Sequence, residues 1–240
     1  MLFDQIKKLF HLIPKSDYQR ILVVGDLHEM YKDFHHLLYD LGQYDPQKDF
    51  LILLGDYIDK GNRPIETIEA VMGLCQESPH VIALRGNHEE MMIQYFENGN
   101  SDWEQEGSPS TIEEFQTMQK TSPEQFQKII EFMKSLPLYH EMNLGSKHYV
   151  FVHAGFDITR PISEQNADTL CWIREAFINH YHGKDIVVIG HTPTMFLGDI
   201  SMSPKMLKNN ILAMDTGACF PDGCISCKDL IHGDIWQSWN

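Results

Sequence analysis

The stretch ILVVGDLHEMYKDF, residues 21–34, begins with four apolar residues, Ile21 to Val24, and turns polar after Gly25. A short apolar run that ends in glycine is typical of a strand buried on both faces, as in a parallel sheet. Asp26 and His28 follow directly, and a helix is expected over about 31–41. The stretch therefore predicts a strand–loop–helix unit with an acid and a histidine after the strand.

The same unit recurs twice. The strand DFLILLGD (49–56) precedes a predicted helix over about 64–75, and HVIALRGN (80–87) precedes one over about 89–96. Asp56 follows Asp26 after 30 residues, and Asn87 follows Asp56 after 31, whereas one strand–helix crossover unit needs roughly 30 residues. Three polar loops are therefore expected at one edge of a parallel sheet, where α/β proteins bind ligands.

Residues 97–136 are polar and are expected to form a helical cap on the domain. Ser110 and Ser122 each precede an acid or amide by three residues, which is the spacing of a capping box. Apolar residues at helical spacing form a stripe that is expected to pack in the protein interior rather than bind a ligand. They are Phe126, Ile129, Ile130 and Met133.

The second half returns to strands. These are KHYVFVHAG (147–155), KDIVVIGHT (184–192), NILAMDTGACF (210–220) and CISCKDL (224–230), with a helix over 166–183 and a hairpin around Pro221–Gly223. Two of them end in His153 and His191. The predicted fold is therefore α/β, with the late strands forming a second sheet packed on the first.

The composition is ordinary for a soluble globular domain. The chain has 240 residues, and its net charge of −15 argues against broad adhesion to nucleic acid or anionic membranes. It has no apolar run of the roughly 20 residues that a membrane span needs. The apolar positions within residues 2–13 fit one face of a helix that would end at Pro14, and packing of this helix on the domain is favoured over an interfacial membrane helix. We expect one domain over 1–240.

The five cysteines indicate a reducing, cytoplasmic setting, since they show no pattern of a small secreted domain. Cys219, Cys224 and Cys227 lie close together near the C-terminus. No second cysteine pair completes a zinc site, so we interpret them as buried thiols rather than a metal or redox site.

The residues at the predicted strand ends form a mixed set of oxygen and nitrogen ligands. They are Asp26, His28, Asp56, Asn87, His153 and His191. Such a set suits manganese, iron or zinc better than calcium. Six protein ligands exceed what one catalytic metal uses while keeping an open position. Two divalent ions that share one carboxylate account for all six.

Five short motifs in this order carry a resemblance to a known family. GDLHE, GDYIDKG, RGNHE, HAG and GHT resemble the phosphoprotein phosphatase (serine/threonine protein phosphatase) branch of the calcineurin-like metallophosphoesterases. The likeness runs over about residues 20–230 and is weakest across 97–136. It implies a four-layer αββα fold, with two packed β-sheets flanked by helices.

The resemblance also implies a dinuclear metal site, with manganese as the first expectation and iron or zinc as alternatives. One ion takes Asp26, His28 and Asp56, and the other takes Asp56, Asn87, His153 and His191. Asp56 then bridges. Two such ions activate a water-derived hydroxide that attacks phosphorus in line.

The resemblance assigns further roles at the same strand ends. His88 matches the family's general acid and Asp59 its partner. Arg174, in CWIRE, matches a phosphate clamp, with a surface ion pair to Glu175 or Asp168 as the alternative. Lys60 and Asn87 are further candidates for phosphate contact.

Two positions depart from the family pattern. Lys60 replaces an arginine, which keeps the charge but loses the planar fork. Glu29 replaces a glycine, so a positive φ there would cost about 1–2 kcal/mol unless something compensates.

The expected function is metal-dependent hydrolysis of phosphomonoesters, with phosphoserine and phosphothreonine in proteins as substrates. The alternative is a diadenosine tetraphosphate hydrolase with the same metal site, in which Trp103 and Phe115 of the cap stack an adenine. A third possibility is a binding module that keeps the fold without turnover. The expected partners are a phosphorylated protein or a small phosphorylated substrate, and the oligomeric state stays open.

Overall fold

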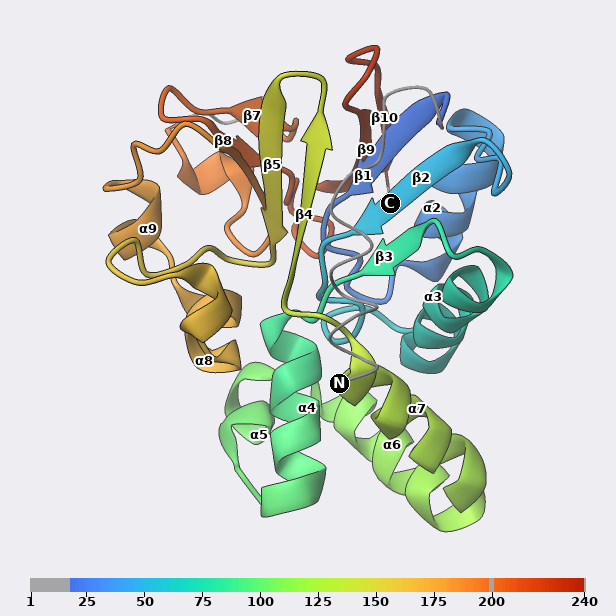
Figure 1. Ribbon diagram of the computed structural model, residues 1–240. Helices are drawn as coiled ribbons and strands as arrows, with labels where there is room; N and C mark the ends of the chain where they lie inside the picture. Colours follow the sequence, from blue (N-terminus) through green and yellow to red (C-terminus); the bar gives the residue numbers. More distant parts are fainter. Residues whose placement is uncertain (1–17, 199–200, 240) are drawn as a thin grey trace, which may run out of the picture.

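The structure is a computed structural model, and it describes residues 18–198 and 201–239. Two five-stranded sheets lie face to face, with helices on their outer sides (Figure 1). The helix predicted over residues 2–13 lies outside the described residues. Among the described helices, none is long and apolar enough to cross a membrane.

The first sheet has the strand order β10-β9-β1-β2-β3. Its strands are β1 (Arg20–Val24), β2 (Asp49–Leu53), β3 (Val81–Ala83), β9 (Cys224–Asp229) and β10 (Ile235–Trp239). The three strands β1, β2 and β3 are parallel neighbours, with Ile21 opposite Phe50. The prediction of adjacent parallel strands with their carboxyl ends at one edge is confirmed.

Helices follow each of these three strands. They are α2 (Tyr31–His35) continued by the π-helix η1 (His36–Leu41), α3 (Pro64–Glu77) and α4 (Asn87–Asn98). All three predicted helical regions are confirmed. Pro64 occupies the first turn of α3, where its missing N–H is not needed.

The second sheet has the strand order β4-β5-β6-β8-β7. Its strands are β4 (Tyr139–Leu144), β5 (Lys147–Val152), β6 (Ile186–Ile189), β7 (Lys205–Met206) and β8 (Ile211–Ala213). The helices of this half are η2 (Ile162–Glu164), α8 (Ala167–Trp172), α9 (Glu175–Ile178) and η3 (Thr194–Phe196). The predicted second sheet is confirmed for the strands at 147–155, 184–192 and 210–220, but the strand predicted at 224–230 is β9 and joins the first sheet instead.

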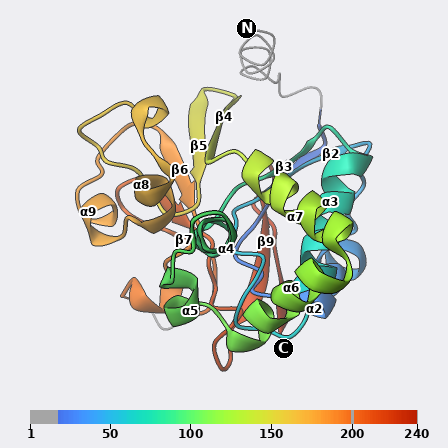
Figure 2. The same cartoon turned by 90° about the horizontal axis from the view of Figure 1, so that it is seen from below.

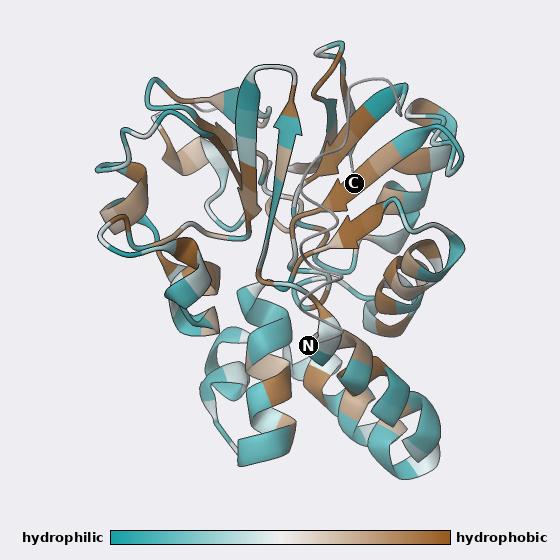
Figure 3. Cartoon of the chain, in the orientation of Figure 1, coloured by the Kyte–Doolittle hydropathy of each residue, from teal (hydrophilic) through white to brown (hydrophobic). Residues whose placement is uncertain are grey.

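The inner strands β1, β2 and β6 are buried on both faces, which explains their uninterrupted apolar runs. In β1, Ile21 and Val23 face the second sheet, whereas Leu22 and Val24 pack with the helices of the first sheet. Figure 3 shows long hydrophobic stretches, in brown, along the strands of both sheets. A third apolar cluster joins β5 and β6 to α8 and α9. The result is the predicted four-layer α/β fold.

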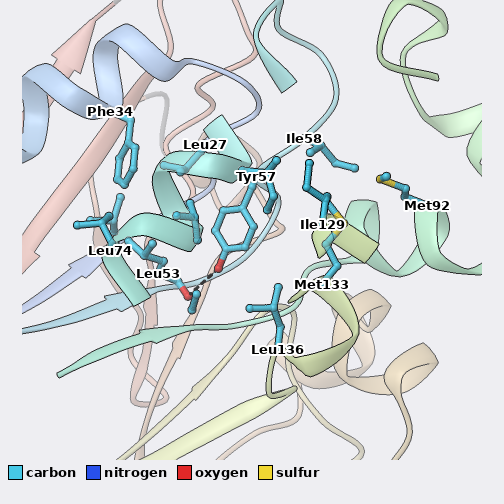
Figure 4. Close-up of a cluster of buried hydrophobic side chains, with 14 of the residues drawn as sticks. Leu27, Phe34, Leu53, Tyr57, Ile58, Leu74, Met92, Ile129, Met133 and Leu136 are labelled. Carbon is cyan, nitrogen blue, oxygen red and sulfur yellow. Dashed lines mark hydrogen bonds between the residues drawn. The ribbon is translucent and has the colours of Figure 1, made fainter. Parts of the chain in front are cut away.

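Three helices occupy the segment predicted as a cap. They are α5 (Asp102–Glu106), α6 (Pro109–Thr121) and α7 (Pro123–Ser135). Figure 2 shows α4 at the centre of this view, between α5 and α7. The stripe from Phe126 to Met133 is buried, and Ile129 and Met133 lie near Ile58 in Figure 4.

The two predicted capping boxes are wrong in detail. Helix α6 begins at Pro109 with Ser108 as its N-cap, so Ser110 lies inside the helix. Ser122 does precede α7, but its side chain makes no capping hydrogen bond. Both helices start on a proline, whose fixed φ favours the first turn without a side-chain cap.

The hairpin predicted around Pro221–Gly223 is also wrong. The chain does turn there, with the Gly223 N–H donating to Phe220 O at 3.0 Å. The flanking strands, however, belong to different sheets, because β8 pairs with β6 and β9 pairs with β1. Strand β9 thereby covers an edge of β1 whose backbone groups would otherwise be unpaired.

Candidate active site and metal centre

All six residues predicted as metal ligands lie at the carboxyl ends of strands. Asp26 and His28 follow β1, Asp56 follows β2, and Asn87 begins α4 just after β3. His153 directly follows β5, and His191 lies two residues after the end of β6. In Figure 1 the arrows of β1, β2, β3 and β5 all point toward the region above α4. Each of the six side chains is buried.

Asp56 lies at the centre of this cluster. Its Oδ1 is 3.3 Å from His153 Nε2, and its Oδ2 is 3.9 Å from His28 Nε2. Two groups of side chains could each hold an ion, namely Asp56 with His28 and His88, and Asp56 with His153 and His191. Asp56 is common to both groups, which is the position that a bridging carboxylate needs.

Asn87 and Asp26 border the same cluster. Asn87 Oδ1 is 3.0 Å from His153 Nε2. The Asp26 carboxylate accepts the backbone N–H of His191 at 3.0 and 3.3 Å. Asp26 therefore lies against His191, although it belongs to neither of the two groups. His88, predicted as an acid, occupies the place beside His28 and Asp56.

The protonation of the histidines follows from burial and from the Asp56 charge. Burial lowers the pKa of His28 to about 3, against the opposing attraction of Asp56. Burial and the neighbouring His153 lower the pKa of His191 to about 2. Burial also disfavours charge on His153, but the Asp56 carboxylate outweighs it and raises that pKa to about 9. His28 and His191 are thus neutral and offer lone pairs at neutral pH.

The donor set fits a pair of divalent ions. His191 Nε2 is buried and has no hydrogen-bond partner among the described residues. A neutral imidazole nitrogen buried without a partner is costly unless it binds something. Imidazole nitrogen with carboxylate and amide oxygen matches the first-row divalent metals, as the sequence indicated.

The backbone bends sharply at these strand ends. His28, Asp56 and His191 all have positive φ, at 44°, 52° and 60°. Residues in this region are strained and are often found at functional sites. Glycines allow the close packing: a Cβ on Gly190 would lie 2.1 Å from Asp26 Oδ1, and one on Gly86 would lie 2.2 Å from Asp56 Oδ1.

Glu29 stands where the family pattern has a glycine, and its backbone adopts the left-handed conformation that glycine tolerates best, with φ of 64°. Its buried carboxylate compensates for the strain. Glu29 Oε1 accepts the Asp59 N–H at 2.6 Å and the Thr111 hydroxyl at 2.5 Å. Burial raises the pKa of Glu29 to about 7. This glutamate therefore ties the first loop to the second loop and to helix α6.

Glu89, in the motif RGNHE, organises the loop that carries Asp56. Its Oε2 accepts the N–H groups of Asp56 and Gly86, each at 2.9 Å. Its Oε1 accepts those of Tyr57 at 2.7 Å and Ile58 at 3.3 Å. The sequence places this residue in a motif but does not by itself indicate its role. Its position three residues after Gly86, typical of a capping box, was the available signal.

His88 and Asp59 are paired. His88 Nδ1 lies 2.7 Å from Asp59 Oδ2, and both side chains are buried. Burial opposes charge on His88, but the carboxylates of Asp56 and Asp59 outweigh it and raise its pKa. The imidazole can therefore carry a proton near neutral pH.

A pocket opens over the cluster, and the two positively charged side chains predicted to bind phosphate lie at it. It has a volume of about 350 Å³, and both Lys60 and Arg174 line it. Arg174 Nη1 donates to His191 O at 2.9 Å and to the Thr192 hydroxyl at 3.1 Å. The guanidinium is thus held beside a predicted ligand, rather than by the surface acids considered as the alternative.

The single helix predicted over 166–183 is wrong, and the break explains how Arg174 reaches the pocket. Helix α8 ends at Trp172 and α9 begins at Glu175. Between them Ile173 is extended, with ψ of 137°, and Arg174 has a non-helical φ of −125°. In one continuous helix the direction of the Arg174 side chain would follow the helical period. The break changes that direction, and Arg174 contacts the loop after β6.

Asp215 is a buried pocket residue that the sequence did not single out. Its Oδ1 accepts the Gly217 N–H at 2.9 Å, and burial raises its pKa to about 6. The motif MDTGACF contained it, but no spacing rule distinguished it from a turn aspartate.

The alternative function had Trp103 and Phe115 stacking an adenine, and the structure contradicts that role. Both side chains are 0% exposed, so neither offers a ring face to a ligand. The aromatic residues at the pocket are instead Trp172, Phe196 and Phe220. They come from the second half of the chain rather than from the cap.

Comparisons with known proteins agree with this geometry. The profile of the calcineurin-like phosphoesterases matches residues 19–211, so the chain belongs to this family. Its relatives are phosphatases and phosphoesterases, and the chain is accordingly a phosphoester hydrolase of a family that uses divalent metal ions.

Two kinds of relative match equally well. A bis(5'-nucleosyl)-tetraphosphatase PrpE of Oceanobacillus iheyensis is 26% identical over 84% of this chain and 85% of its own length. Serine/threonine-protein phosphatase 1 of Salmonella typhimurium is 26% identical over 89% of this chain and 94% of its own. These identities leave the substrate open.

Solved structures share the fold. A cold-active protein-tyrosine phosphatase of a psychrophilic Shewanella has a TM-score of 0.65 at 15% identity, covering 96% of this chain and 84% of that one. A protein serine/threonine phosphatase of Saccharomyces cerevisiae has a TM-score of 0.64 at 16% identity, covering 95% and 82%.

Proposed function

We propose that this chain removes phosphate from phosphoserine and phosphothreonine in proteins. One observation carries the proposal: a single pocket is lined by predicted metal ligands, by His88 and by the cations of Lys60 and Arg174. Bound metal and fixed cations are what a phosphate dianion needs, and a proton donor is what an alkoxide leaving group needs.

We propose two divalent ions at this site, manganese first and iron or zinc as alternatives. One would be held by Asp26, His28 and Asp56, and the other by Asp56, Asn87, His153 and His191. When bound, such ions activate water as a nucleophile and neutralise phosphate charge.

The side chains of the pocket would then divide the remaining work. Arg174 and Lys60 bind the phosphate oxygens, with the Arg174 fork oriented by Thr192 and His191 O. Asn87, at the start of α4, lines the same pocket and is a further candidate for phosphate contact. These contacts align the phosphorus for attack from the side opposite to the leaving oxygen.

His88 protonates the leaving group. Its Nδ1 contacts Asp59, so its Nε2 is the nitrogen that faces Asp56 and the pocket, 3.9 Å from Asp56 Oδ2. As the bond between phosphorus and the serine or threonine oxygen breaks, Nε2 gives its proton to that oxygen. Asp59 orients the imidazole and stabilises its charged form before transfer.

The size of the pocket favours a phosphorylated side chain over a dinucleotide. Its volume of about 350 Å³ lies near the lower end of the roughly 300–1,000 Å³ typical of small-molecule sites. Trp103 and Phe115 of the cap are buried, so neither ring can serve as a platform for a base.

Hydrolysis of dinucleoside tetraphosphates is the second candidate. Trp172, Phe196 and Phe220 line the pocket, and Phe196 is 63% exposed. Exposed rings beside a phosphate site can stack a nucleobase. The relative named bis(5'-nucleosyl)-tetraphosphatase points the same way.

Parallel assays on the manganese-loaded protein separate the two. We expect a higher kcat/KM on a phosphoserine peptide than on diadenosine tetraphosphate, with Phe196→Ala changing the peptide rate little. A preference for the dinucleotide that Phe196→Ala abolishes would replace the first proposal by the second. Binding of phosphopeptides without turnover even of aryl phosphates would indicate a binding module.

We also propose that residues 1–240 act as one domain with a helical cap at about 97–136. The setting proposed is the reducing cytoplasm, because the five cysteines are free thiols and Cys171, Cys224 and Cys227 are buried.

A further inference from the structure

The Asp59 carboxylate, which contacts His88, is held mainly by the segment 97–136. Asp59 Oδ2 accepts the indole N–H of Trp103 at 2.7 Å, the same distance as its contact with His88 Nδ1. Asp59 Oδ1 accepts the Ser108 backbone N–H at 2.8 Å. Both oxygens of this fully buried carboxylate are thus fixed from α5 and from the turn that follows it.

The indole of Trp103 has little freedom to leave this position. It is 0% exposed and packs edge-on against Tyr95 and Phe96, at 5.5 and 5.8 Å between ring centroids. Gly107 closes over it, since a Cβ there would lie 2.5 Å from the indole Cδ1. This packing fixes the orientation of the indole, so its N–H is directed at Asp59 Oδ2.

The backbone of the Asp59 loop depends on the same segment. Asp59 and Lys60 have positive φ values of 69° and 73°. The Lys60 N–H donates to the Ser108 hydroxyl at 2.6 Å, and the Asp59 N–H donates to Glu29, which also accepts from Thr111. A strained loop keeps its shape only when its surroundings over-determine it.

We propose that Trp103 is a positioning residue for the Asp59–His88 pair, through which the cap sets how well the leaving oxygen is protonated. The proposal rests on the proposed function, in which His88 is the general acid. An indole N–H on Oδ2 fixes the direction in which that oxygen meets the imidazole, and a hydrogen bond to a charged group is among the stronger ones. The alternative is that Asp59 merely satisfies a buried indole.

Leaving-group dependence distinguishes positioning from packing. Phenyl phosphate needs a proton on its departing oxygen, whereas 2,4-dinitrophenyl phosphate releases a stable anion. We expect Trp103→Phe, which keeps an aromatic ring, to lower kcat on phenyl phosphate about 10- to 100-fold. On 2,4-dinitrophenyl phosphate the change should stay under about twofold. Trp239→Phe, at an exposed tryptophan of β10, should alter neither rate.

The same assay separates this inference from the proposed function. His88→Asn should lose activity selectively on phenyl phosphate. If it does and Trp103→Phe lowers both rates equally, Trp103 only packs and the inference is overturned while the acid assignment stands. If His88→Asn lowers both rates equally, the acid assignment itself is wrong. In an Asp59→Asn background, Trp103→Phe should lower the rate on phenyl phosphate little further. Additive losses in rate would show that Trp103 does not act through Asp59.

A measurement without turnover covers the case in which Trp103→Phe does not fold. In metal-free, nitrogen-15-labelled protein, the Trp103 indole N–H should resonate downfield of the other three tryptophans and exchange slowly with solvent. Asp59→Asn should move it upfield. An indole resonance that is indifferent to Asp59→Asn would mean that the hydrogen bond is absent, and the proposal would be withdrawn.

Discussion

Replacing Glu89 by glutamine should destabilise the protein by several kcal/mol although the side chain keeps its shape. Each carboxylate oxygen of Glu89 accepts two backbone N–H groups, Oε2 from Asp56 and Gly86 and Oε1 from Tyr57 and Ile58. A glutamine can accept on one side only. Whichever way its amide is turned, its own NH2 faces two N–H donors in a site that is 0% exposed.

The size of the effect follows from those two donors. A buried donor left without its partner costs about 1–3 kcal/mol, so the loss should be about 2–6 kcal/mol. That is a large part of the 5–15 kcal/mol that holds a typical domain together. Because the freed N–H groups include those beside Asp56, the predicted bridging residue should also move.

Urea unfolding of the metal-free protein, followed by circular dichroism, measures this loss. Glu164→Gln provides the matched control, since Glu164 is exposed in η2 and surface changes of this kind stay within roughly ±0.5 kcal/mol. Metal content is a second readout, and Glu89→Gln should retain less manganese after dialysis than the parent. A destabilisation below about 1 kcal/mol with unchanged metal content would refute the role given to Glu89.

Three further predictions concern the pocket and the cap. His88→Asn should lower kcat on phosphopeptides about 10²- to 10⁴-fold with near-normal metal content by elemental analysis; loss of the ions together with activity would contradict the acid assignment. Lys60→Arg should raise phosphomonoesterase kcat/KM, because it restores a bidentate fork, and an equal or lower rate in the same assay would mean that lysine is tuned for another substrate. Met133→Ala should lower the free energy of unfolding by about 2–5 kcal/mol in urea titration, because Met133 is 0% exposed in the cluster of Figure 4, and a loss under 1 kcal/mol would show that the cap is not part of the core.

The fold was predictable from the sequence to the extent that its signals are local. The apolar runs before Asp26 and Asp56 and the 30-residue spacing identified parallel strands, because a strand buried on both faces has no polar positions. Helix ends were less predictable. Ser110 had the right spacing for a cap, but Pro109 already starts α6. The break at Arg174 has no local sequence signal, because it is fixed by hydrogen bonds to residues 17 and 18 positions away.

The candidate site divides in the same way. Motif order placed Asp56, Asn87 and His153 at strand ends, and in the structure Asn87 Oδ1 and Asp56 Oδ1 lie 3.0 and 3.3 Å from His153 Nε2. The roles of Glu29 and Trp103 could not be foreseen. Each contacts Asp59 from 30 or more residues away. From the sequence alone, Glu29 could equally have been a surface acid and Trp103 a ring that stacks a ligand.

The sequence alone determined the family, the layered α/β architecture and the residue types that meet at the sheet edge, because strand periodicity and motif spacing are properties of the chain itself. Only the tertiary structure decided how the Asp59 loop is supported, which aromatic rings reach the pocket and which sheet the late strand β9 joins. Those outcomes depend on contacts between segments far apart in sequence. Burial decides the role of such a residue. Trp103 is 0% exposed, so its one polar group, the indole N–H, must form a hydrogen bond with a neighbouring residue rather than with a ligand.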